Sequence, residues 1–286
     1  MRIIKHNLNV GSRRDIVPRF PEGIEIPRIL HQTFHTRLLP QAIHDNVEKI
    51  RSMNPDWEYR YYDDADIVDF IRNNYSEQVL GYFARINPMY GASRADLFRY
   101  LLMYKCGGVY IDIKSSLRKP LADVLRKDDR YLLSGWKDDK MPQFDGWGVH
   151  DVGNGDVFEE YQQWHIAAAP GHPFLRAVIE NVLWNIDKYI PSLHGVGKPG
   201  VLSLTGPVAY TSAIRPLLHL HQHRVVQSQS DLGFQYSVFD MPDGHNSLFK
   251  AHYSDLSESI IQMEGKNKIY ELIFKLLKKI RGIVFS

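Results

Sequence analysis

The stretch from Gly91 to Pro120 constrains the fold of this chain more than any other part of the sequence. Its first half, 92–106, is apolar on nearly every side, which predicts a helix buried in a core and not one lying on a surface. Asp96 and Arg99 interrupt this apolar segment three residues apart and so share one face of the helix. Burying such a pair is costly unless both charges have partners or a function. We therefore expect this helix to carry a charged cluster into the core.

A short strand is predicted directly after the helix. Gly107 and Gly108 end the helix, because glycine accepts the left-handed backbone that a helix terminus favours. From Val109 to Lys114 the residues alternate as in a strand, with Asp112 and Lys114 on the same side. Ligands in open α/β sheets usually bind at the carboxyl ends of the strands. Asp112 and Lys114 are thus candidates for a binding site.

The remaining segments predict an α/β fold built from alternating strands and helices. Gly-, Pro- and Asp-rich stretches between them are interpreted as loops over the site. Strands are expected at 26–33, 57–62 and 131–134 and near Val225 and Val238, helices at 40–53, 66–74, 173–189 and 209–220 with a break at Pro216, and loops at 135–155 and 191–207.

No repeat, low-complexity tract or clear linker divides the chain of 286 residues, so a single domain is expected. We assign residues 1–265 to this domain, with 1–23 as a lead-in arm. Residues 266–286 are predicted to form a basic amphipathic helix, because apolar residues recur at helical spacing opposite several lysines. Such a helix fits an anionic membrane surface, and equally a terminal helix packed on the domain.

Composition excludes some classes of function. A net charge of +2 is too small to indicate nucleic-acid binding. The single cysteine, Cys106, permits no internal disulfide, and the polar amino terminus does not resemble a signal peptide. We therefore expect a cytoplasmic protein, with the cytoplasmic face of the inner membrane as the place of any peripheral contact.

Several further blocks surround the Gly91–Pro120 stretch in a fixed order, namely IPRILHQTF (26–34), NPDWEYRYYDD (54–64), AAAPGHPFL (167–175), TGP (205–207) and KAHYSD with His252. With these blocks, over residues 24–255, the chain resembles glycosyltransferase family 32, the DXD-containing sugar transferases of bacterial capsule synthesis and fungal mannosylation. The resemblance implies a GT-A-like single domain with a Rossmann-like mixed central sheet flanked by helices. One position departs from the family pattern, because Asp112-Ile113-Lys114 stands where the family reads D-X-D.

The resemblance implies a site for a nucleotide diphosphate sugar, with a UDP-sugar favoured as donor. It implies catalytic roles for Asp112, Lys114 and Asp96. A competing interpretation makes Asp96 and Arg99 a structural ion pair and His31 to Thr33 an ordinary strand end. The residues expected to bind the donor are His31, Gln32, Thr33, Arg94, Asp96, Arg99, Tyr110, Asp112 and Lys114.

Two hypotheses follow for the charge that develops on the leaving diphosphate. In the first, Lys114 contacts the phosphates and weakens or replaces the dependence on a divalent cation, since an ammonium group cannot ligate a metal. In the second, Mn or Mg is still held by Asp112 with His252 and donor oxygens. The sequence alone leaves both open.

The acceptor is expected to be a glycan or a lipid-linked glycan. Aromatic rings stack on sugar faces and carboxylates bond hydroxyls, so Trp147, Asp145, Gln163 and Trp164 are predicted to form its pocket. The overall expectation is a retaining transferase that moves a hexose to a hydroxyl of a cell-surface glycan. The alternatives are a toxin-like enzyme that glycosylates protein and a nucleotide-sugar-binding protein without turnover.

Overall fold

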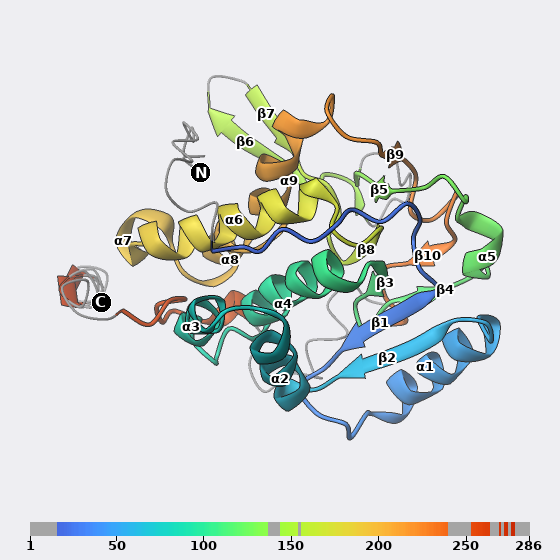
Figure 1. Ribbon diagram of the computed structural model, residues 1–286. Helices are drawn as coiled ribbons and strands as arrows, with labels where there is room; N and C mark the ends of the chain where they lie inside the picture. The colour runs from blue at the N-terminus through green and yellow to red at the C-terminus, as the bar shows by residue number, and fades with distance from the viewer. Residues whose placement is uncertain are drawn as a thin grey trace.

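A computed structural model describes residues 16–136, 144–153, 156–239 and 253–263, together with residues 269, 272, 273, 276 and 277. Within these residues a six-stranded sheet lies between two layers of helices and loops (Figure 1). The elements in chain order are β1 (Ile29–Thr33), α1 (Gln41–Met53), β2 (Glu58–Tyr62), α2 (Asp64–Asn74), α3 (Glu77–Arg85), α4 (Gly91–Cys106), β3 (Gly108–Ile111), β4 (Ser116–Leu117), α5 (Leu121–Val124), β5 (Tyr131–Leu133), β6 (Val149–Gly153), β7 (Asp156–Glu159), β8 (His165–Ala168), α6 (Pro173–Lys188), α7 (Pro191–His194), α8 (Gly197–Leu204), α9 (Pro207–Ile214), η2 (Arg215–Leu217), β9 (Arg224–Val225), β10 (Phe234–Gln235) and η4 (Tyr253–Asp255).

The central sheet has the order β2-β1-β3-β8-β5-β9 and mixes parallel with antiparallel pairs. β1 is parallel to both β2 and β3, whereas β8 is antiparallel to β3 and to β5. Two small sheets lie beside it, β10 with β4 and the β6–β7 hairpin. The predicted mixed central sheet flanked by helices is confirmed.

Side chains alternate across β3 and so connect the two layers of core. Val109 and Ile111 pack on the side that includes α1 and α5, while Tyr110 points to the side of α4, α6 and α9. α4 is buried along almost its whole length, as its apolar sequence predicted. It therefore lies inside the domain, in the middle of the picture, and β3 begins beside its C-terminal end (Figure 1).

The junction between α4 and β3 requires glycine. Gly107 caps the helix with a φ of 63°, and Gly108 follows with a φ of 100°. A Cβ on Gly108 would lie 2.5 Å from the carbonyl oxygen of Ile29 on the neighbouring strand. Any larger residue would push β3 away from β1, so the two glycines set the position of the strand.

The N-terminal arm packs against the domain over its described part, 16–23. The amide of Gly23 donates to Pro170 O at 2.8 Å, and the hydroxyl of Tyr104 donates to Pro18 O at 3.1 Å. The ring of Phe20 lies 5.2 Å from that of Tyr104. Since Tyr104 belongs to α4, the arm contacts the central helix itself.

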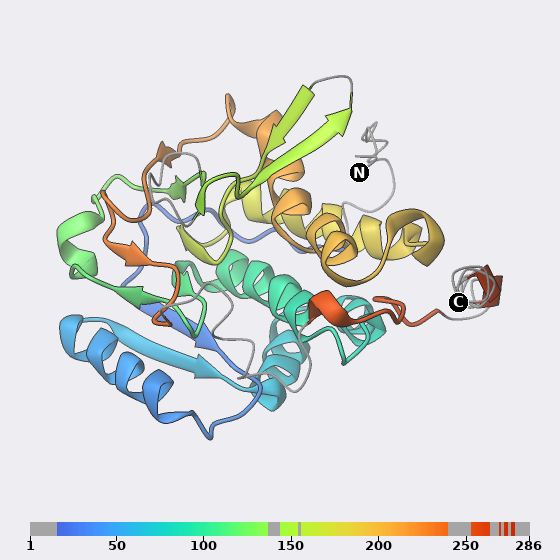
Figure 2. The ribbon, with the colours of Figure 1, turned by 180° about the vertical axis from the view of Figure 1, so that it is seen from behind.

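Four predictions about elements were wrong in detail. β3 ends at Ile111, because the carbonyl of Asp112 accepts from the amide of Ser115 and closes a turn. The loop expected at 135–155 contains strand β6, whose hairpin stands apart from the central sheet beside α9 (Figure 2). The loop expected at 191–207 contains helices α7 and α8, and the strand expected near Val238 lies earlier, at β10.

Two predictions fall wholly or largely outside the described residues. His252 lies outside them, and so does most of the predicted C-terminal helix. In the predicted C-terminal helix, the described apolar residues are helical and 44–65% exposed, namely Ile269, Leu272, Ile273, Leu276 and Leu277. No helix within the described residues is long and apolar enough to cross a bilayer.

Candidate functional site

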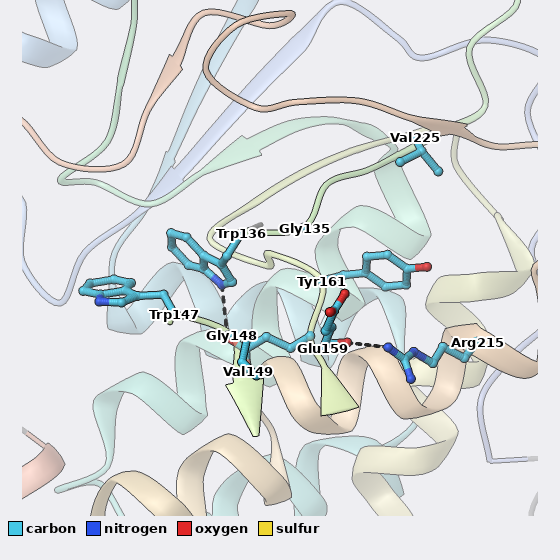
Figure 3. A pocket seen from close by; sticks show the side chains of 10 residues that line it. Gly135, Trp136, Trp147, Gly148, Val149, Glu159, Tyr161, Arg215 and Val225 are labelled. Carbon is cyan, nitrogen blue, oxygen red and sulfur yellow. Dashed lines mark hydrogen bonds between the residues drawn. The ribbon is translucent and has the colours of Figure 1, made fainter. Parts of the chain in front are cut away.

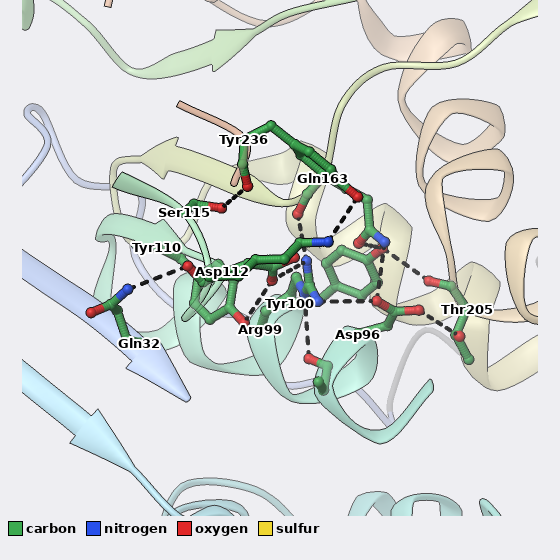
Figure 4. Close-up of polar contacts among 12 residues, drawn as sticks. Gln32, Asp96, Arg99, Tyr100, Tyr110, Asp112, Ser115, Gln163, Thr205 and Tyr236 are labelled. Atoms are coloured by element: carbon green, nitrogen blue, oxygen red, sulfur yellow. Dashed lines mark hydrogen bonds and ion pairs between the residues drawn. The ribbon is translucent and has the colours of Figure 1, made fainter. Parts of the chain in front are cut away.

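Three charged residues form a continuous chain from the core to the surface. Arg99 Nη2 lies 3.3 Å from Asp96 Oδ1, and Arg99 Nη1 lies 3.1 Å from Asp112 Oδ1 (Figure 4). The side chains of Asp96 and Arg99 are 4% and 6% exposed, whereas that of Asp112 is 24% exposed. The cluster therefore reaches solvent at Asp112, just after the end of β3.

Residues from distant segments complete this charged cluster. Gln163 Nε2 donates to Asp96 Oδ1 at 3.0 Å, and Thr205 Oγ1 donates to Asp96 Oδ2 at 2.9 Å. Arg99 Nη1 also donates to the carbonyl of Gln163 at 2.8 Å. The hydroxyl of Tyr100 lies 2.6 Å from Gln163 Oε1 and 2.9 Å from Thr205 O. Each buried charge thus has the partners that burial demands.

The charges also set one another's protonation. Burial raises the pKa of Asp96, and Arg99, Gln163 and Thr205 oppose that rise by stabilising the carboxylate. Burial alone would lower the pKa of Arg99, but Asp112, Tyr110 and Asp96 outweigh it and hold the pKa above its ordinary value. Arg99 is therefore a permanent cation beneath Asp112.

Lys114 lies in the turn that follows Asp112 and not on a strand. Its Nζ donates to the hydroxyl of Tyr236 at 2.8 Å and lies 4.1 Å from the centre of that ring. Ser115 Oγ donates to the carbonyl of Tyr236 at 2.8 Å, and the amide of Val238 donates to Lys114 O. The turn is therefore held from the side of the segment after β10, and its lysine is 8% exposed.

The described residues do not offer a ready site for a divalent cation. They contain no group of three His, Cys, Asp or Glu side chains that could hold a metal ion. Asp112 supplies one carboxylate, which is already shared with Arg99, and the position of the second motif carboxylate carries the ammonium group of Lys114. Hard divalent cations take about six oxygen ligands, so most would have to come from the donor or from residues outside this set.

The residues predicted to reach the nucleotide lie within or at the end of β1. His31 is fully buried, with Nε2 3.0 Å from Gly107 O and Nδ1 3.3 Å from the hydroxyl of Tyr62. Burial lowers its pKa to about 4, so it is neutral near pH 7. Gln32 Nε2 donates to Asp112 O at 3.3 Å, and Thr33 Oγ1 donates to Tyr62 O. These contacts describe structural roles, and a donor-binding role for the three residues stays a prediction.

Two other predicted donor residues flank the charged cluster differently. The hydroxyl of Tyr110 donates to Asp112 Oδ1 at 3.3 Å, and its ring lies 4.9 Å below the guanidinium of Arg99. Arg94 projects from the first turns of α4 and stacks 4.3 Å from the ring of Phe83. Tyr110 is thus part of the cluster, whereas Arg94 contacts its own layer of helices.

Of the four residues predicted for the acceptor, Trp147 and Trp164 both pack against Tyr236, with ring centroids 5.5 Å from that of the tyrosine in each case. Gln163 belongs to the charged cluster, and Trp164 is 4% exposed and donates to Gln162 Oε1 at 3.0 Å. Asp145 is exposed, and Trp147 is half-buried against aromatic neighbours. Their role in acceptor binding stays a prediction.

Sequence reasoning missed three contributors to the site. Thr205 lies in the TGP block, which marked its segment without assigning it a contact. Tyr100 occupies the apolar helix and resembled a packing residue. Tyr236 comes from a segment with no recognisable motif, so only the structure reveals its contact with Lys114.

Part of the chain is similar to known sugar transferases. Residues 40–132 match the family model described as a glycosyltransferase sugar-binding region containing a DXD motif. Over 163 residues the chain is 28% identical to inositol phosphoceramide mannosyltransferase 1 of Schizosaccharomyces pombe, which covers 55% of this chain and 43% of that protein. Over 210 residues it is 25% identical to the initiation-specific alpha-1,6-mannosyltransferase of the same organism, covering 70% and 50%.

A solved structure is also similar. The PaToxG glycosyltransferase aligns with a TM-score of 0.48 and 16% identity, over 68% of this chain and 70% of that chain. The chain spans about half the length of the curated relatives that it matches.

Proposed function

We propose that this chain transfers a hexose from a nucleotide diphosphate sugar, because residues 40–132 match the model of a glycosyltransferase sugar-binding region containing a DXD motif. The observation that carries the proposal is the partly exposed Asp112 carboxylate, which is paired with the buried Arg99 at 3.1 Å. Arg99 orients this carboxylate, which can accept hydrogen bonds from hydroxyl groups of the donor sugar or ribose. The turn after β3 is then the donor site, at the edge where α/β sheets bind ligands.

We propose that Lys114 supplies positive charge to the leaving diphosphate. An ammonium group can stabilise the charge that builds on phosphate oxygens without a metal ion. Its contact with the ring and hydroxyl of Tyr236 supports this role, because both hold Nζ at the turn beside Asp112. The competing arrangement is a cation held by Asp112, His252 and donor oxygens. The chelator experiment described below distinguishes the two.

The hexose and the acceptor follow from the relatives only as proposals. Their names describe transfer of mannose, in one case to inositol phosphoceramide and in another as an alpha-1,6 linkage. We propose mannose as the hexose and a hydroxyl of a cell-surface glycan or lipid-linked glycan as acceptor, with retention of the anomeric configuration. The exposed apolar residues between 269 and 277 support a peripheral contact of the C-terminal segment with the membrane that carries such an acceptor.

The test combines binding with turnover. Thermal-shift measurements with UDP- and GDP-hexoses, each with and without Mn, identify the donor, and release of nucleotide with glycan or protein acceptors measures transfer. Asp112→Asn should abolish turnover, whereas the exposed carboxylate of α5 offers a matched control in Asp123→Asn, which should leave it intact. Donor binding without turnover by the wild type would instead indicate a non-catalytic binding protein, and transfer to protein alone would indicate a toxin-like enzyme.

The role of Lys114 is tested by adding a chelator at saturating donor. Full activity in the chelator would support charge neutralisation by Lys114 and would exclude the cation held by His252. Activity lost in the chelator and restored by Mn would overturn this part of the proposal.

A further inference from the structure

A cavity lies between the β6–β7 hairpin and the loop after β5. It has a volume of about 140 Å³ and shares none of its lining residues with the charged cluster at Asp112. Trp136 and Trp147 lie on one side of it, and Tyr161 and Arg215 on the other, as Figure 3 shows. The lining residues that carry the argument are Trp136, Trp147, Glu160, Tyr161 and Arg215.

The polar side of this cavity is a fixed carboxylate. Glu160 is 8% exposed, and its oxygens accept from Trp136 Nε1 at 3.1 Å and from His150 Nε2 at 2.6 Å. An ionised carboxylate has about four acceptor positions, so it can still accept from hydroxyl groups of a ligand. Arg215 closes the opposite end, where Nη2 donates to Glu159 O at 2.6 Å. The cavity therefore has rigid polar groups, as binding sites for small polar molecules do.

The aromatic side connects the cavity to the proposed donor site. The rings of Trp136 and Trp147 lie 5.3 Å and 5.5 Å from that of Tyr236, whose hydroxyl accepts from Lys114. On the other side the chain runs directly from Tyr161 in the cavity wall to Gln163, which bonds Asp96. An indole ring and then Tyr236 would therefore stand between a ligand in the cavity and Lys114.

We infer that this cavity, given the proposed sugar transfer, binds a ring of the acceptor next to the one whose hydroxyl reacts. Its ligand class is a six-membered polyhydroxylated ring, either a pyranose or a cyclitol. A cavity of about 150 Å³ can hold benzene, which has a six-membered ring without hydroxyl groups. The C–H face of such a ring packs on indole, and its hydroxyls donate to a carboxylate such as Glu160. Of the four acceptor residues predicted from sequence, Trp147 lines this cavity.

The test uses the full chain and two probes, methyl α-mannopyranoside and myo-inositol, whose binding is followed by ligand-observed NMR. Trp147→Ala and Glu160→Gln should each weaken probe binding and raise the acceptor KM about tenfold, with donor affinity unchanged. Trp147→Phe keeps an aromatic wall and should retain most of the affinity. Trp184→Ala, an equal truncation on α6 away from the cavity, serves as the control.

The outcomes separate the cavity from the donor site. Preference for one probe identifies the source of the ring, and binding of either probe that is lost in both variants supports the inference. The inference is wrong if neither probe binds, or if donor affinity falls as much as acceptor affinity in Trp147→Ala. In that case the residues of the cavity only pack against Tyr236 and hold its ring in place. If the probes bind but no nucleotide sugar does, the proposed function fails while the ring site stands.

Discussion

Replacing Arg99 by methionine should destabilise the protein more than the loss of any exposed ion pair would, because the replacement leaves the buried Asp96 without its cation. Asp96 and Arg99 are 4% and 6% exposed and lie 3.3 Å apart, with Asp112 3.1 Å from the same guanidinium. At an effective dielectric constant of about 20, each contact represents an attraction of about 5 kcal/mol. Desolvation cancels much of this, so removal of one partner from such a buried pair typically costs about 3–5 kcal/mol.

The loss should depend on pH in a defined direction. Burial already raises the pKa of Asp96, and removal of Arg99 takes away a charge that opposes this rise. The folded variant then binds a proton that the unfolded chain does not bind above its own pKa of about 3.9. Its stability relative to wild type should therefore increase as the pH falls from about 7 to about 5, by about 1.4 kcal/mol per pH unit while the folded pKa lies above that range.

Urea unfolding at several pH values measures both effects. Asp96→Asn combined with Arg99→Met should remove the pH dependence, since no ionisable group remains at the centre of the cluster. Arg72→Met breaks an exposed pair, 50% and 65% exposed, and should change stability by less than about 1 kcal/mol. A loss under about 1 kcal/mol for Arg99→Met at neutral pH, or equal pH dependence in the single and double variants, would refute the reasoning.

Three further predictions test separate parts of the structure. Lys114→Asp restores the second motif carboxylate and should make transfer dependent on Mn, so full activity of this variant in a chelator would contradict the role given to Lys114. Burial lowers the pKa of His165 to about 3, so the wild type should lose stability as the pH falls below the unfolded pKa of about 6.5. In His165→Gln this loss, measured by urea unfolding at several pH values, should be smaller by about 1.4 kcal/mol per pH unit. An unchanged dependence of stability on pH would contradict this role of His165. Gly108→Ala should cost about 3 kcal/mol through its positive φ and its approach to Ile29, whereas Gly81→Ala in α3, which meets nothing within 4 Å, should stabilise slightly in the same thermal melts.

The sequence was most informative where local chemistry and tertiary structure agree. α4 is apolar on all sides and ends in two glycines, so its burial, its end and the following strand could be predicted. Asp96 and Arg99 stood out because charges are rare in such a helix. Their pairing in the structure follows from their spacing of three residues.

The partners of this helix could not be predicted, because they come from segments far apart in the chain. Gln163 and Thr205 contact Asp96 across 67 and 109 residues, and Tyr236 contacts Lys114 across 122. Local patterns contain no information about such contacts. The lysine also lies in a turn and not on the strand, because Ser115 bonds back to Asp112 and ends the alternation.

Short elements were misassigned for a related reason. α8 contains two glycines and a proline, which indicate a loop when taken alone. Its Val201 and Leu204 are nevertheless buried against the core, and this packing stabilises a helix that propensity disfavours.

The packing of the N-terminal arm connects the proposed donor site to residues distant from it in sequence. Gly23 bonds Pro170, and a Cβ on Gly107 would lie 2.6 Å from the ring of that same proline. Gly107 directly precedes the strand that ends beside Asp112. A shortened protein that begins after Gly23 would lose the hydrogen bond that holds Pro170 against the junction between α4 and β3. Truncation at this end should therefore alter donor affinity before it abolishes folding.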